Sequence, residues 1–190
     1  QRQMCIRDRE LYRFDNVQAA AEMIKIRYAL LPYLYSEFLK AALQDEMMFE
    51  PLAFEFPDDS MAKQVEDQLL LGKELMIAPV YKQNAQGRYV YLPEEMMLVR
   101  MRSCASYETT ILPKGHHYIA IALDELVFFI RKQKSIPLAK PAANTEQIDL
   151  QTCQLLGYPN SSYELYADNG DSPRPEDSLH RSTLQNDVSC

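Results

Sequence analysis

The hydrophobic positions in the first quarter of the chain recur at helical spacing. This period places them on one face of an α-helix. Asp15 and Asn16 come directly before the run, and either side chain can cap the first turn. The pattern predicts one long amphipathic helix that buries its leucine and tyrosine face against a sheet. The apolar positions, in steps of three and four, are Met23, Ile26, Leu30, Leu34, Phe38 and Ala41.

A different pattern follows the helix. Residues 47–56 form a nearly continuous apolar run of strand length, as in a strand that is covered on both faces. Pro57 ends the run. Residues 58–72 then resemble a short helix, with Asp59 or Ser60 as its N-cap and Gly72 as its end. We therefore predict helix, buried strand and helix, which is an α/β arrangement.

From Leu75 onward, short apolar runs alternate with polar turns. This spacing is typical of an antiparallel β-sandwich, and it sets a boundary near residues 73 and 74. A stretch rich in proline and alanine, residues 138–147, predicts a linker. Beyond it we expect a strand that runs into an Asn169-Gly170 turn, and then a poorly ordered tail from Pro173. The six apolar runs are residues 75–81, 88–93, 96–102, 107–112, 117–123 and 125–130.

Composition and charge narrow the class of partner. The 190 residues carry a net charge of −7, which argues against nucleic acid and against an anionic membrane surface. No apolar run approaches the ~20 residues that a membrane span needs. The four cysteines are far apart, so we expect reduced thiols rather than a zinc site, and a cytoplasmic location is favoured. They are Cys5, Cys104, Cys153 and Cys190.

Four carboxylates crowd into residues 49–59, and they are the first candidates for chemistry. Two carboxyl groups can perform acid–base catalysis when their surroundings drive their pKa values apart. The commoner explanation is a strand followed by a capped turn, because most carboxylates are solvated or cap a helix. The residues are Glu50, Glu55, Asp58 and Asp59.

Two other clusters are weaker candidates. His116 and His117 lie in a predicted loop, and with only His180 elsewhere they do not make a set of metal ligands. Residues 168–171 contain part of a calcium-loop pattern but lack the later bidentate glutamate. We therefore interpret both as surface turns.

Six blocks, in this order, resemble the C-terminal part of glycoside hydrolase family 31, the α-glucosidases and α-xylosidases. Together they extend over most of the chain. The blocks are RYALLPYLYSEF (27–38), EPLAFEFPDD (50–59), DQLLLGKELMIAPV (67–80), VYLP (90–93), LVFFIRKQKSIPL (126–138) and YELYADNGDS (163–172).

Residues 1–8 are polar and have no helix or strand period, so we expect a non-native leader and exclude it from fold assignment. For the rest of the chain the resemblance implies an α+β fold with three parts. Residues 9–73 are expected to be the last helix and strand of a (β/α)8 barrel, and residues 74–139 the proximal C-terminal β-sandwich. Residues 140–190 are expected to begin a distal β-domain with a disordered tail. The helix and the 47–56 strand then lack the neighbours of a complete barrel. Their apolar faces are expected to pack on the sandwich, to self-associate or to stay exposed, and residues 74–139 are expected to form the stable unit.

The resemblance also implies a reaction. Members hydrolyse α-linked glucosides or xylosides with retention, using two aspartates and neither metal nor cofactor. Those aspartates belong to a Trp-x-Asp-Met-Asn motif and a later loop that are absent here, and the chain contains no tryptophan. We therefore assign no catalytic, cofactor-binding or metal-binding residue to this chain and expect it to be inactive alone. An α-glucoside or α-xyloside oligosaccharide is the expected partner of the full-length parent, with neither nucleic acid nor membrane.

Two further expectations follow from the resemblance. The four carboxylates of residues 49–59 are structural, because the family's chemistry does not use them. The family usually has arginine where this chain has Glu50, so we expect an unpaired Glu50 and a stabilising Glu50→Arg substitution. The rival interpretation is a free-standing β-sandwich that binds carbohydrate or is purely structural. Such binding modules usually expose tryptophan, and this chain has none, which counts against the rival interpretation.

Overall fold

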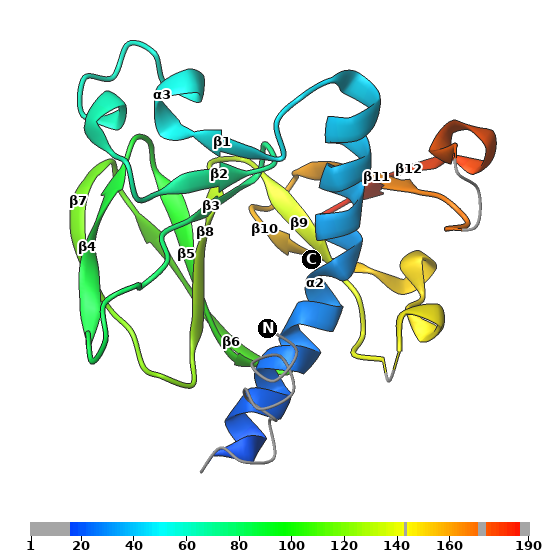
Figure 1. The fold of residues 1–190 in the computed structure, drawn as a ribbon, viewed down its shortest axis with the longest axis horizontal. Coiled ribbons are helices and arrows are strands. Elements are labelled where there is room, and N and C mark those ends of the chain that lie inside the picture. Colours follow the sequence, from blue (N-terminus) through cyan, green and yellow to red (C-terminus); the bar gives the residue numbers. More distant parts are fainter. Residues whose placement is uncertain (1–15, 143, 171–173, 187–190) are drawn as a thin grey trace, which may run out of the picture.

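A computed structural model describes residues 16–142, 144–170 and 174–186. It is a mixed structure of helix and antiparallel sheet (Figure 1). The predicted long helix is present as α2 (Val17–Gln44). Asn16 is its N-cap, and its side chain accepts a hydrogen bond from the Ala19 amide at 3.1 Å. Asp45 ends the helix in the left-handed conformation. The predicted leader, residues 1–8, lies outside the described residues.

The main sheet has six antiparallel strands in the order β1-β2-β3-β8-β5-β6. Four of the predicted runs form strands of this sheet, at β3, β5, β6 and β8. The other two form the separate pair β4 and β7. The bounds are β1 (Phe49–Pro51), β2 (Leu69–Leu71), β3 (Leu75–Ile77), β5 (Met96–Ser103), β6 (Ser106–Leu112), β8 (Leu126–Arg131), β4 (Gly87–Leu92) and β7 (Gly115–Ala120).

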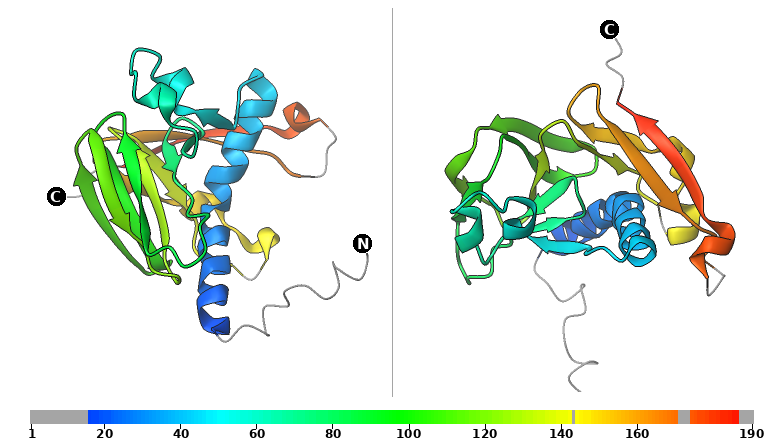
Figure 2. Two further views of the ribbon diagram at one scale, coloured as in Figure 1. Left: turned by 60° about the vertical axis from the view of Figure 1, so that its left-hand side comes forward. Right: turned by 90° about the horizontal axis from the view of Figure 1, so that it is seen from above.

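Apolar side chains are buried on both faces of the main sheet. On β5, Met96 and Leu98 pack toward the β4 and β7 pair, whereas Val99 and Met101 pack toward α2. This alternation is the period of two that a strand imposes on its side chains. Figure 2 shows the β4 and β7 pair on one side of the sheet and α2 on the other. The main antiparallel sheet therefore packs against the β4 and β7 pair on one face and against α2 on the other.

The apolar face of α2 packs on the main sheet, which is one of the three outcomes expected for the helix of an incomplete barrel. Ile26 and Tyr33 are fully buried in the same core as strands β5, β8 and β11 (Ser162–Ala167). The Ala139 amide, directly after β9 (Ser135–Leu138), donates a hydrogen bond to the Ala29 carbonyl at 2.9 Å and so connects this segment to the helix. The neighbours that a barrel would supply are replaced by the sheet and by the segments that follow it.

Two local predictions between α2 and β3 are wrong. The expected strand over residues 47–56 is a strand only at β1, and the chain turns at Pro51 into the short helix α3 (Leu52–Glu55). The expected helix over residues 58–72 shrinks to one 3-10 turn, η2 (Ala62–Gln64), after which β2 pairs with β1 and β3. Strand pairing on both sides of β2 buries Leu70 and Leu71.

The C-terminal part adds two strand pairs. β9 (Ser135–Leu138) pairs with β10 (Gln154–Gly157), and β11 (Ser162–Ala167) pairs with β12 (His180–Gln185). The 3-10 helices η3 (Thr145–Gln147), η4 (Leu150–Thr152) and η5 (Pro175–Ser178) lie in the connections.

Strand β12 corrects one expectation about the C-terminus. Residues 180–185 pair along the whole of β11, so this part of the tail is ordered. The expected assignment of residues 9–73 to a barrel end, the boundary at residues 73 and 74, and the distal domain stay predictions. Strands β1 and β2 nevertheless share a sheet with β3, on the other side of that boundary.

Candidate functional site

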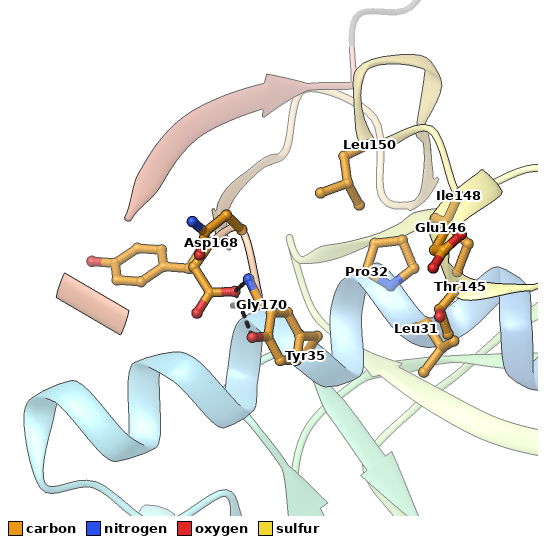
Figure 3. A pocket seen from close by; sticks show the side chains of 11 residues that line it. Leu31, Pro32, Tyr35, Thr145, Glu146, Ile148, Leu150, Asp168 and Gly170 are labelled. Carbon is orange, nitrogen blue, oxygen red and sulfur yellow. Dashed lines mark hydrogen bonds between the residues drawn. The ribbon is translucent and has the colours of Figure 1, made fainter. Parts of the chain in front are cut away.

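A cavity with a volume of about 430 Å³ lies beside α2. Figure 3 shows Pro32 and Leu31 of the helix facing Ile148 and Leu150, with Tyr35, Asp168 and Gly170 at the other end. The Tyr35 hydroxyl donates a hydrogen bond to Asp168 Oδ1 at 2.6 Å. Burial, together with that hydrogen bond, raises the pKa of Tyr35 to about 12. A tyrosine held in its protonated form is a donor rather than a base, so this cavity has the character of a binding or packing site.

The second residue of the Asn169-Gly170 dipeptide has the predicted turn conformation. Gly170 has a φ of 71°, and its amide donates to Asp168 Oδ1 at 3.1 Å. The connection between β11 and β12 is longer than a two-residue hairpin turn, because the strands end at Ala167 and resume at His180. One carboxylate oxygen of Asp168 therefore accepts hydrogen bonds from both the Gly170 amide and the Tyr35 hydroxyl.

The four carboxylates of residues 49–59 do not meet at one site. Glu50 pairs with Lys73 at 3.1 Å, and Glu55 pairs with Arg131 at 2.8 Å. Asp58 is exposed. Glu50 and Glu55 are thus directed at two different cations, which supports the structural interpretation.

Asp59 has the densest set of partners among these acids. Its Oδ1 accepts from the amides of Met61 and Ala62 at the start of the η2 turn. Its Oδ2 accepts from the Tyr91 hydroxyl at 2.7 Å and from the Lys114 ammonium. The hydrogen bond from Lys114, followed by that from Tyr91, holds the pKa of Asp59 well below its usual range. A carboxylate that stays ionised and saturated with donors is a structural anchor, not a general acid.

The structure reveals a carboxylate pair that sequence reasoning missed. Glu37 of α2 and Glu74, next to β3, are both buried, and burial and then the charge of Glu37 raise the pKa of Glu74. Glu37 accepts from the Tyr163 hydroxyl at 2.7 Å and pairs with Lys40 at 2.7 Å. The signal in the sequence was Glu37 itself, which lies one turn after Tyr33 on the apolar face of the helix.

The buried pair lacks access to a ligand. Carboxylates with perturbed pKa values become catalytic candidates when they face a cleft. Glu37 and Glu74 line neither the cavity beside α2 nor two smaller cavities of about 120 and 300 Å³. The Glu74 Oε2 atom is buried and has no hydrogen-bond partner among the described atoms. We therefore interpret the pair as a buried structural network that costs stability.

The remaining candidates do not gather into a metal site. His117 contacts the Pro113 carbonyl at 2.8 Å, and the His116 ring packs against Tyr91. Cys104 and Cys153 are free, whereas Cys5 and Cys190 lie outside the described residues. Within residues 16–142, 144–170 and 174–186, no group of three or more His, Cys, Asp or Glu side chains is placed to hold a metal ion. No helix in the same ranges is long and apolar enough to cross a membrane.

Comparison with known proteins assigns a family. Residues 45–136 match the model of the glycosyl hydrolase family 31 C-terminal domain. This chain carries the C-terminal domain of glycosyl hydrolase family 31. The family-31 match begins at Asp45, directly after α2, and ends within β9, so it covers the main sheet and the β4 and β7 pair.

Individual relatives agree with this family-31 assignment. The chain is 31% identical over 183 residues to lysosomal α-glucosidase from Mus musculus, covering 86% of this chain and 19% of that protein. It resembles in fold a family-31 dextranase from Flavobacterium johnsoniae complexed with glucose, with a TM-score of 0.71 and 24% identity over 93% of this chain and 22% of that one. A family-31 α-xylosidase from Xanthomonas citri gives a TM-score of 0.71 and 24% identity, covering 93% and 20% of the two chains. The chain thus spans about a fifth of the length of these relatives.

Proposed function

We propose that this chain is the C-terminal part of a retaining α-glycosidase that hydrolyses α-linked glucosides or xylosides. The observation that carries the proposal is the match of residues 45–136 to the family-31 C-terminal domain. The relatives and fold neighbours named above are an α-glucosidase, a dextranase and an α-xylosidase, which supports an α-linked sugar of the glucose or xylose type as substrate.

In this proposal the chain supports catalysis rather than performing it. A retaining glycosidase needs two carboxyl groups about 5 Å apart on either side of an open sugar site. Glu50, Glu55 and Asp59 are instead each bonded to a separate cation. Glu37 and Glu74 are buried, and neither lines the cavity beside α2. The two catalytic aspartates are therefore expected elsewhere in the parent enzyme.

We further propose that α2 and β1 correspond to the last helix and strand of the parent's (β/α)8 barrel. Part of the outer face of α2 supports this assignment, because Tyr35 and Phe38 stack on each other while remaining 39% and 53% exposed. Exposed aromatic side chains on a helix that already packs a sheet are suited to contact a further layer. The rest of the barrel is that layer in this proposal.

Sequencing the gene upstream of the codon for Arg9 tests the proposal. We expect the reading frame to continue and to encode a Trp-x-Asp-Met-Asn motif within a few hundred codons. A stop codon directly upstream would contradict the proposal and favour the free-standing carbohydrate-binding or structural module.

Activity of the isolated chain gives a second test. Release of p-nitrophenol from aryl α-glucoside and α-xyloside is expected to equal the buffer blank. Turnover above the blank that disappears in Asp59→Asn or Glu55→Gln, but persists in the exposed control Asp58→Asn, would show that this chain holds its own catalytic acid.

A further inference from the structure

Three exposed tyrosines surround a second cavity, of about 300 Å³, at one end of the β4 and β7 pair. Tyr89 belongs to β4 and Tyr118 to β7, and Tyr81 comes from the loop between β3 and β4. Their exposed fractions are 72%, 56% and 67%, respectively. Large aromatic side chains usually bury most of their surface, so three of them at one cavity require an explanation.

Strand pairing explains only part of this cluster. Tyr89 and Tyr118 are direct cross-strand partners, and their rings meet at 5.2 Å between centroids with planes 66° apart. Such aromatic pairs stabilise antiparallel strands. This accounts for two rings but not for Tyr81, which is not part of either strand. It also does not account for the cavity between the rings and the loop.

The polar groups at this cavity are held in fixed positions. The Arg88 guanidinium donates to the Pro79 carbonyl at 2.8 Å and pairs with the Asp67 carboxylate at 2.6 Å. The Tyr81 hydroxyl donates to Asp67 Oδ2 at 3.4 Å, and the Arg88 guanidinium lies 5.9 Å from the centre of the Tyr81 ring. A network that is already assembled loses little conformational entropy when a ligand binds.

Most of the charge at the cavity is paired. Arg88 and Asp67 neutralise each other, and Lys82 adds one ammonium group to the lining. Because three tyrosine rings line the cavity beside these polar groups, a ligand that has both apolar faces and hydroxyl groups fits these surroundings. A sugar ring presents C–H groups on its faces, which pack on aromatic rings, and hydroxyls around its edge, which can bond to an aspartate and a tyrosine.

We propose that the cavity formed by Tyr81, Tyr89 and Tyr118 over the Arg88–Asp67 ion pair binds an oligosaccharide of α-linked glucose. The site holds the chain of a long substrate without taking part in its hydrolysis. The α-linked class rests on the proposed function, whereas binding of a neutral sugar rests on the cavity itself. Tyr89 and Tyr118 supply the stacking surface, and Asp67 and Tyr81 supply the hydrogen bonds.

Titration of the purified 190-residue chain tests this proposal. Maltotriose and isomaltotriose are added to ¹⁵N-labelled protein, and binding is followed by amide shifts near β4 and β7. We expect saturable binding, a loss of tenfold or more in affinity for Tyr89→Ala and for Tyr118→Ala, and near-normal affinity for Tyr89→Phe. The matched control is Tyr107→Ala, which removes an exposed strand tyrosine of β6 that does not line this cavity.

Each other outcome overturns a defined part of the proposal. Absence of saturable binding in a chain whose circular dichroism is unchanged overturns the site. An equal loss of affinity in Tyr107→Ala overturns its location. Equal affinity for the β-linked cellotriose overturns the α-linked class. These titrations use the isolated chain, so an upstream stop codon would contradict the proposed function without altering their result.

Discussion

Arg131 offers a direct test of whether the acidic stretch is structural, because it connects that stretch to the main sheet. Its Nε donates to Glu94 at 2.7 Å, and its Nη1 donates to Glu55 at 2.8 Å and to the Lys73 carbonyl at 3.2 Å. The guanidinium also lies 5.1 Å from the centre of the Phe56 ring. The Arg131 side chain is 12% exposed, whereas that of Glu55 is 30% exposed.

The expected energies follow from these contacts. A hydrogen bond to a charged group contributes about 1.5–3 kcal/mol when buried, and solvent reduces that value for the partly exposed carboxylates of Glu55 and Glu94 to about 1 kcal/mol. Arg131→Gln loses two such bonds and a cation–π contact of about 0.5 kcal/mol, so we expect it to lower the free energy of unfolding by about 2.5 kcal/mol. Glu55→Gln loses one bond, which gives about 1 kcal/mol.

Urea unfolding followed by circular dichroism measures both changes. With a denaturant dependence of about 2.5 kcal/mol/M, Arg131→Gln is expected to lower the midpoint by about 1 M. The double variant Glu55→Gln/Arg131→Gln completes a cycle, and the coupling energy between the two positions is expected to be about 1 kcal/mol. The exposed Asp58→Asn is the matched control and should change stability by less than about 0.5 kcal/mol. A coupling energy near zero would refute the argument that Glu55 serves to hold Arg131.

Two further predictions concern buried carboxylates. Because the pKa of Glu74 is raised in the folded state, stability falls as pH rises from the unfolded value, about 4.3, through the folded value. Urea midpoints at a series of pH values should therefore show Glu74→Gln gaining stability relative to wild type as pH rises, whereas the exposed control Glu164→Gln should not. Parallel curves for Glu74→Gln and wild type would contradict the raised pKa. Glu50 has a partner in Lys73, so Glu50→Arg should lower the free energy of unfolding by about 1–2 kcal/mol, opposite to the gain expected from the family's usual arginine. The charge swap Glu50→Arg/Lys73→Glu should recover part of this loss. A single variant that is more stable than wild type would contradict the pairing.

The sequence predicted best where the local pattern and the tertiary structure agree. The strands from β3 to β8 follow alternating or short apolar runs between polar turns, and each forms within the predicted run or one or two residues from its bounds. The α2 helix is predicted equally well, because its apolar stripe is the face that the sheet covers. In both cases the residues that pack are the residues that set the period.

Partners distant in sequence could not be predicted in the same way. Glu50 lies opposite Leu70 in the β1 and β2 register, and only this pairing brings Lys73 beside it. Tyr81 lines the second cavity together with Arg88 and Tyr89 of β4, and the hydrophobic periodicity of the sequence does not predict where its loop lies. The family usually has arginine at position 50, so Glu50 was expected to be unpaired. That expectation did not take Lys73 into account, which the fold places beside Glu50.

Gly72 shows how one misassigned signal led to several errors. Its position after an apolar run suggested the end of a helix, where glycine often has positive φ. Gly72 does have a φ of 67°, but it begins the turn from β2 to β3, and its amide donates to the Met48 carbonyl at 2.8 Å. A Cβ atom there would overlap the carboxylate of Glu37. The glycine therefore lets α2 and this turn approach closely enough to bury Glu37 beside Glu74. The glycine that suggested the end of a helix over residues 58–72 instead belongs to a strand turn, and this turn is what buries the carboxylate pair that sequence reasoning missed.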